Sequence, residues 1–183
     1  MLFASRRVKP QRLRMTTPQI ILFCIGYFIE FCLVVYFTRA TTRRVLGALI
    51  GSVPAMLFGL GAIALCEKLG WWRVPIAPTQ YPLYLGLSIT LAPIYLVTWR
   101  VARRFGWRGL AVFTGVVTII GAPRDYLIAT WFPKWMVFSP GVAPILADSA
   151  TYFGIVVLGH AVMRLVAGPA GADRLARDQR KAH

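Results

Sequence analysis

The chain has 183 residues, 57% of them hydrophobic and only 15% charged, whereas an average soluble domain is about half apolar and about a quarter charged. Its net charge is +15, which in a soluble protein would point to nucleic acid. Here, however, the basic residues bracket apolar runs long enough to cross a bilayer, where such clusters set topology and attract anionic headgroups. We therefore predict an integral membrane protein whose partners are membrane lipids, with anionic headgroups at its basic loops, and no nucleic acid.

Apolar runs recur along the chain, each close to the roughly 20 helical residues that cross a hydrocarbon core. They predict an all-α fold, a polytopic transmembrane helix bundle of about five spans with short loops. The predicted spans cover residues 18–37, 45–66, 81–99, 109–132 and 142–166. Together they form a single transmembrane bundle over 18–167, between a basic N-terminal segment (1–17) and a polar, basic C-terminal tail (168–183).

The first two runs carry signals of a membrane anchor and of tight helix packing. Thr17 and Pro18 suit the N-cap and the first position of a helix, and no small-residue cleavage site follows, so we expect an uncleaved anchor. The second run places small residues at steps of four: Gly47, Gly51, Ala55 and Gly59. Such a ridge lets two backbones approach closely, and we predict a helix-packing face, either inside the bundle or between protomers.

The later runs and their connectors contain proline and tryptophan. Pro123 lacks a backbone N–H and clashes with the preceding helical turn, so we predict that the fourth span is broken there. Whether segment 109–132 crosses the membrane or turns back as a re-entrant loop stays open at this stage. The connector 67–80 predicts an irregular loop at the membrane interface. All six tryptophans fall near span ends, as expected for an aromatic belt.

Five spans place the N-terminus and the connectors 67–80 and 133–141 on one membrane face, which we call side A. The arginine-rich loops 39–44 and 100–108 and the C-terminal tail then lie on the opposite face, side B. Side B carries more basic residues, which favours a cytoplasmic side B. The basic residues before the first span argue for the opposite, so the orientation stays open.

Several ionisable residues fall inside predicted spans, and three of them share one level. By helical rise, Asp125 and Asp148 lie about 9–10 Å from side A, and Arg124 is beside them. Ionisable groups at such a depth normally face the bundle interior and either pair or serve a function. We take Arg124, Asp125 and Asp148 as candidate catalytic residues. The predicted lining of a polar pocket open to side A adds Glu30, Tyr84, Ser88, Thr118 and Tyr152.

A structural role for these charges is the alternative. Arg124 is expected to pair with Asp125 or Asp148, and an Arg124–Asp148 pair alone would be an interhelical clamp with no chemistry. His160 is expected to be a hydrogen-bonded packing residue. No second histidine stands at ligand spacing and no Cys-x-x-Cys occurs, so we expect no metal site and no cofactor.

Signatures of serine hydrolases, phosphate-binding loops and zinc proteases are absent from the sequence. A single buried carboxylic acid can still protonate a double bond of a lipid. The leading hypothesis is a multi-pass protein of a bacterial cytoplasmic membrane whose buried polar pocket binds or transforms an apolar lipid or polyprenyl-type substrate. The alternatives are a non-catalytic subunit or assembly factor, which packs against a membrane-protein partner or a second copy, and a small transporter. Whether the protein is an enzyme stays open.

Overall fold

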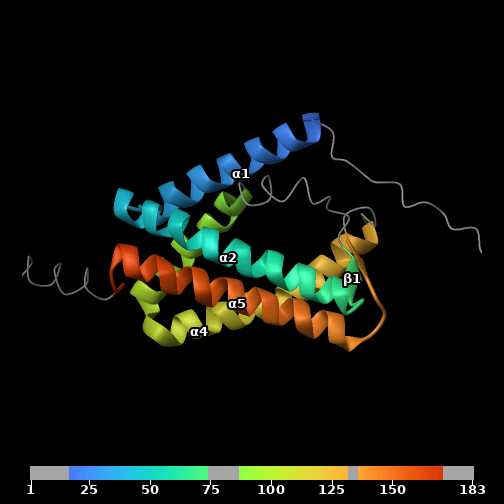
Figure 1. The fold of residues 1–183 in the computed structure, drawn as a ribbon. Coiled ribbons are helices and arrows are strands. Elements are labelled where there is room, and N and C mark those ends of the chain that lie inside the picture. The colour runs from blue at the N-terminus through green and yellow to red at the C-terminus, as the bar shows by residue number, and fades with distance from the viewer. Residues whose placement is uncertain (1–16, 74–86, 132–135, 171–183) are drawn as a thin grey trace, which may run out of the picture.

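The computed structural model describes residues 17–73, 87–131 and 136–170, and most of these residues are helical (Figure 1). The elements in chain order are α1 (Thr17–Thr38), α2 (Thr42–Lys68), β1 (Trp72–Arg73), the 3-10 helix η2 (Leu87–Leu91), α4 (Ala92–Trp131), β2 (Val137–Phe138) and α5 (Val142–Ala167). Among the described residues, three segments are long and apolar enough to cross a membrane: Thr42–Lys68, Ile89–Trp131 and Val142–Ala167. The all-α membrane class fits the structure, whereas these helices do not by themselves establish five crossings.

The bend in α4 falls at Gly106, inside the predicted loop 100–108, and not at Pro123. The helix continues through Pro123 to Trp131, so the predicted break at Pro123 is wrong. The backbone leaves the helical region at Gly106 instead, with φ 69° and ψ −160°, and two helices meet there. A positive φ is costly for a residue with a Cβ but not for glycine, whereas proline in a membrane helix frees few backbone groups, which neighbours can satisfy. The parts 92–105 and 107–131 therefore correspond to the third and fourth predicted spans.

The ridge of small residues on α2 packs against α5, which runs antiparallel beside it (Figure 1). A Cβ added to Gly47 would lie 3.1 Å from the Met163 carbonyl oxygen. One added to Gly51 would lie only 2.5 Å from the Gly159 carbonyl oxygen. The whole ridge is buried: Gly47, Gly51, Ala55 and Gly59. Its place is therefore inside the bundle, where glycine allows the α2 and α5 backbones to approach closely.

The first helix, α1, lies along the outside of the bundle against the first part of α4 (Figure 1). Its Phe31, Val34 and Val35 pack on the buried core, while many of its other apolar side chains are exposed. α2, α4 and α5 also expose large apolar side chains. A soluble protein rarely shows so much apolar surface, so this surface supports contact with lipid.

Two connectors meet at one end of the bundle. β1 follows α2, β2 precedes α5, and the two pair antiparallel with Trp72 opposite Phe138. Ser139 donates two hydrogen bonds to the Trp71 carbonyl oxygen, from its backbone N–H (2.8 Å) and from its hydroxyl (2.9 Å). The described parts of the two side-A connectors therefore share one end of the bundle and form a short strand pair there. Residues 74–80 of the first connector lie outside the described residues, so the irregular loop expected there stays a prediction.

At the opposite end of the bundle, two arginine side chains join neighbouring helices by hydrogen bonds. Arg43 Nε donates to the Val166 carbonyl oxygen (2.8 Å), which joins the start of α2 to the end of α5. Arg100 Nη1 donates to the Thr38 carbonyl oxygen (3.0 Å), which joins α4 to the end of α1. The loops assigned to side B therefore gather at this end.

Of the five tryptophans that the structure describes, two are exposed, two are buried and Trp71 is half-buried. Trp107 and Trp131 are 75% and 68% exposed at helix ends, as expected for an aromatic belt. Trp72 and Trp99 are only 3% and 4% exposed, so for them the expectation is wrong. The Phe138 ring of β2 packs edge-to-face on Trp72, and the Arg44 guanidinium lies over the Trp99 ring at 3.9 Å from its centroid. Contacts across the bundle thus withdraw both rings from lipid.

His160 packs in the interior with a hydrogen bond. Its Nδ1 lies 2.8 Å from Thr98 Oγ1, and both side chains are buried. Thr98 Oγ1 also donates to the Tyr95 carbonyl oxygen at 2.9 Å. This pair joins α4 to α5 in the half of the bundle toward side B.

Replacing Thr98 with valine should lower the free energy of unfolding by about 1–3 kcal/mol, because the buried Nδ1 of His160 loses its partner. Thermal unfolding in detergent, followed by circular dichroism, measures the effect. Thr130→Val is the matched control, since exposed Thr130 makes a similar bond to the Leu127 carbonyl oxygen (2.6 Å) and no contact to a histidine. Equal losses in the two variants would mean that the bond to His160 contributes nothing.

Candidate functional site

Asp125 is the centre of a polar network between α4 and α5. Arg124 donates two hydrogen bonds to Asp125 Oδ1, from Nε (3.1 Å) and from Nη2 (2.8 Å). Tyr152 of α5 donates its hydroxyl proton to Asp125 Oδ2 (2.7 Å) and accepts a hydrogen bond from Arg124 Nη2. The Arg124 side chain is 57% exposed and that of Asp125 is 23% exposed. Each carboxylate oxygen therefore has a fixed partner in a partly exposed site.

A glycine provides the space for this network. A Cβ added to Gly121 would lie 2.5–2.7 Å from three ring atoms of Tyr152. The absence of a side chain thus lets the Tyr152 ring lie against α4 and bring its hydroxyl to Asp125. Gly121 and Asp125 are four residues apart and share one face of a helix. Because α4 stays helical through Pro123, these two residues keep that relation.

Asp148 lies one helical turn before Tyr152 on α5 and is only 6% exposed. Its Oδ2 atom is buried and has no hydrogen-bond partner within the part of the chain that the structure describes. The carboxyl group is within electrostatic range of Asp125 and Arg124. Burial of a polar group without a partner costs free energy, and such a group in a native interior calls for an explanation.

An ion pair between two neighbouring residues of α4 decides between the two pairings expected for Arg124. Arg124 pairs with Asp125, and the described residues show no ion pair between Arg124 and Asp148. The contact that ties α4 to α5 here runs through Tyr152 instead. Thr118 on α4 also has a buried hydroxyl that finds no partner among the described residues. Asp148 and Thr118 thus both keep hydrogen-bonding capacity that the described part of the chain does not use.

The rest of the predicted pocket lining is not brought to this site. Glu30 is exposed on α1, so its assignment to the pocket is wrong. Tyr84 lies outside the described residues, and for Ser88 the structure gives only the backbone, within η2.

Two residues near the cluster were not selected from the sequence. Tyr27 of α1 is within electrostatic range of Arg124, and Cys66 of α2 is within range of Asp148. Tyr27 could have been suspected from the sequence, because its polar ring stands inside an apolar run. Cys66 could not, because a buried cysteine resembles any small apolar residue. Both approach the cluster across helix interfaces, which spacing along one helix does not reveal.

An aromatic layer covers the same end of the bundle. The Phe138 ring of β2 lies 5.8 Å from the Trp72 ring and 5.4 Å from the Tyr126 ring. Tyr126 directly follows Asp125 on α4, so the strand pair lies close to the polar network. Trp72 Nε1 is buried and, among the described residues, has no hydrogen-bond partner.

The described residues contain no group of three or more His, Cys, Asp or Glu side chains that could hold a metal ion. Comparison of the chain with protein-family models, with curated proteins and with solved structures finds no match. The site residues and their geometry therefore carry the functional argument.

Replacing Tyr152 with phenylalanine should destabilise the bundle by about 1.5–3 kcal/mol, because its hydroxyl bonds to two charged side chains. Unfolding in detergent by a denaturing titrant measures the change. Tyr126→Phe is the matched control, since the structure gives the Tyr126 hydroxyl no hydrogen bond among the described residues, and it should cost less than about 0.5 kcal/mol. Similar losses for both variants would show that the Tyr152 hydroxyl does not hold α4 to α5.

Proposed function

We propose that the protein binds and transforms an apolar lipid or polyprenyl-type substrate at a polar site between α4 and α5, near side A. The observation that carries the proposal is Asp148, a nearly fully buried carboxyl group whose Oδ2 has no partner in the described part of the chain. A protein retains such a group at a cost in stability, and an ionisable residue inside a membrane is by default a functional hypothesis.

In this proposal Asp148 is the acid. Burial without a partner disfavours the charged form of a carboxyl group, so Asp148 suits the step in which a proton passes to a substrate double bond. Asp125 accepts hydrogen bonds from Arg124 and Tyr152 and is less suited to release a proton. Its fixed carboxylate suits electrostatic stabilisation of the positive charge that develops on the substrate, and Arg124 orients it.

An apolar substrate fits the surroundings of the site. The helices expose large apolar side chains over much of their length, so an acyl or polyprenyl tail can approach from the bilayer without crossing water. We further propose a multi-pass protein with five crossings in a bacterial cytoplasmic membrane. Supporting this, the part 107–131 of α4 is about 37 Å long by helical rise, which is enough to cross the hydrocarbon core.

The second candidate is a non-catalytic subunit or assembly factor with a membrane-protein partner or a second copy. The Arg124–Asp125–Tyr152 network favours it to the extent that the network ties two helices together. The small-residue ridge, however, is occupied by α5, so a partner would need another face. A small transporter ranks last, because the buried α5 residues between Asp148 and His160 include the apolar Val156 and Gly159.

The test is complementation of a strain that lacks the gene by Asp148→Asn, Asp125→Asn and Arg124→Gln, with the amount of protein in the membrane measured in parallel. The proposal expects loss of function at normal protein levels, complete for Asp148→Asn and partial for the other two. Loss of function only in proportion to a loss of protein would favour the structural role instead.

A further inference from the structure

Glu30 is the one charged residue of α1, a helix that is otherwise strongly apolar. It lies roughly 20 Å along the helix from Thr17 and roughly 12 Å from Thr38 by helical rise. If α1 crosses the bilayer as proposed, the Glu30 carboxyl group lies within the hydrocarbon. A glutamate side chain is too short to reach the headgroups from there, unlike the long side chains of lysine and arginine near helix ends.

The Glu30 side chain is exposed, and the residues that the structure describes offer it no hydrogen bond and no ion pair. Ionisable residues within a membrane normally face the bundle interior or pair with one another. Lipid tails cannot take the place of such a partner, because they have no hydrogen-bonding groups. Glu30 therefore needs a polar partner that reaches it from outside the described bundle.

Three further exposed residues stand in line with Glu30 on α1. Gly26 precedes it by four positions, and Leu33 and Phe37 follow at three and seven, a spacing that puts all four on one side of a helix. Leu33 is 50% exposed and Phe37 is 69% exposed. A Cβ added to Gly26 would meet nothing within 4 Å, so the described bundle does not require glycine there. A small residue on a membrane helix lets another backbone approach closely.

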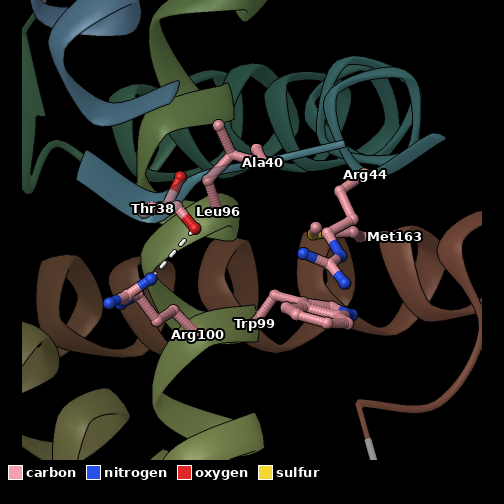
Figure 2. Close-up of a pocket in the computed structure, with 7 residues that line it drawn as sticks. All are labelled: Thr38, Ala40, Arg44, Leu96, Trp99, Arg100 and Met163. Atoms are coloured by element: carbon pink, nitrogen blue, oxygen red, sulfur yellow. Dashed lines mark hydrogen bonds between the residues drawn. The ribbon is translucent and has the colours of Figure 1, made fainter. Parts of the chain in front are cut away.

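The bundle holds α1 so that this stripe stays exposed. Figure 1 shows α1 along the outside of the bundle, and its Phe31, Val34 and Val35 pack on the core. At its C-terminal end, Arg100 Nη1 of α4 donates to the Thr38 carbonyl oxygen at 3.0 Å (Figure 2). These contacts use a different side of α1 and fix its rotation about its own axis. The stripe is thus a surface that a second helix can reach from the bilayer.

We propose that a second copy of this chain docks on the stripe Gly26, Glu30, Leu33 and Phe37 within the membrane. A two-fold axis along the membrane normal puts equivalent residues of the two copies at the same depth, so the two Glu30 side chains meet. A neutral carboxyl group has both a donor and acceptor oxygens, and two of them therefore satisfy one another. Gly26 lets the two α1 helices approach closely, and Leu33 and Phe37 pack beside the carboxyl pair.

The symmetry of the pairing favours a second copy over another membrane protein. A different partner would need a polar group of its own at the depth of Glu30, whereas a second copy has one there in every case. The proposal rests on the proposed crossing of the membrane by α1, and it does not depend on the chemistry proposed for Asp148.

Sedimentation equilibrium of the full chain in density-matched detergent measures the dissociation constant of the dimer. Glu30→Leu should weaken the dimer about fivefold or more, because the interhelical hydrogen bonds are lost. Glu30→Gln should stay within about twofold of the unchanged protein, since an amide also donates and accepts. The control Cys32→Leu changes an exposed residue on nearly the opposite side of α1, and it should also stay within about twofold.

Three results of this experiment would overturn the proposal. The unchanged protein could be a monomer at every concentration, which would mean that lipid alone covers α1. Glu30→Leu could dimerise as tightly as the unchanged protein. Glu30→Gln could weaken the dimer as much as Glu30→Leu, which would mean that Glu30 needs its charge and faces a basic group rather than a second carboxyl group.

Gly26→Leu tests the same surface without a change in polarity. The added side chain meets nothing in the described bundle, so the midpoint of thermal unfolding measured at a monomeric concentration should not fall. The dimer should weaken severalfold, because the two α1 helices can no longer approach closely. An unchanged dissociation constant would remove Gly26 from the interface and overturn the proposed crossing.

Cysteine cross-linking in native membranes checks that the dimer exists outside detergent. Leu33→Cys, in a chain whose three natural cysteines are replaced by alanine, should form a disulfide-linked dimer on mild oxidation. A chain that keeps only the natural Cys32 should not, because Cys32 lies away from the stripe. Equal cross-linking at both positions would indicate random collision and overturn the interface. Asp148→Asn should cross-link like the unchanged protein at Leu33→Cys, which separates this test from that of the proposed lipid chemistry.

Discussion

Gly51→Ala should destabilise the bundle by about 2–3 kcal/mol, which we expect to be among the largest effects of a single added methyl group in this chain. The added Cβ would lie 2.5 Å from the Gly159 carbonyl oxygen, which is backbone and cannot turn aside. The α2 and α5 helices would have to separate along their shared interface. Denaturant titration in detergent, with circular dichroism as the signal, measures the loss.

Gly61→Ala is the control for this experiment. Gly61 lies on the same helix, is exposed, and would place its Cβ with nothing within 4 Å. Alanine favours helix over glycine by up to about 1 kcal/mol, so Gly61→Ala should leave stability unchanged or raise it slightly. If Gly51→Ala were as stable as Gly61→Ala, the close approach of α2 and α5 at Gly159 would be contradicted.

Asp148→Asn should abolish function, with a fall of at least about a hundredfold in the rate that supports complementation, since a positioned general acid contributes about 10²–10⁴-fold. The exchange keeps the side chain's shape and removes its acidic proton. Because Asp148 Oδ2 makes no hydrogen bond to the described residues, the amount of protein in the membrane should stay normal. Growth rate at matched protein level is the readout.

Glu30→Gln provides the matched exchange of acid for amide at an exposed position on α1. It should complement like the unchanged protein, because Glu30 lies outside the cluster between α4 and α5. If Asp148→Asn grew as well as Glu30→Gln at the same protein level, Asp148 would have no role in chemistry.

The helical class and the packing ridge could be read from the sequence because both depend on local spacing. The steps of four from Gly47 to Gly59 put small residues on one helix face, and that face meets α5 in the structure. The turn at Gly106 falls inside the predicted loop 100–108, so it too was readable from the sequence. The break predicted at Pro123 was wrong, because neighbouring helices and local adjustments can satisfy the few backbone groups that a proline leaves free in a membrane helix.

The sequence predicted which charged residues form the candidate site, but not which of them pair with one another. Depth along each helix placed Asp125 and Asp148 at one level, and the structure brings Tyr152 to Asp125 across the interface. Sequence spacing could not tell which aspartate would pair with Arg124, since that depends on the rotation of α5 against α4. Nor does spacing along one helix show that Tyr27 of α1 and Cys66 of α2 come within electrostatic range of the cluster, since that depends on how those helices pack against α4 and α5.

The most direct test of the account is the lipid profile of membranes from a gene-deletion strain that carries either the unchanged protein or Asp148→Asn at equal level. If Asp148 is the acid that acts on a lipid, the variant's profile should match that of the empty deletion strain, with one lipid species accumulated and its product missing. A profile identical to that of the unchanged protein would contradict the account, and the cluster between α4 and α5 would then be a structural contact.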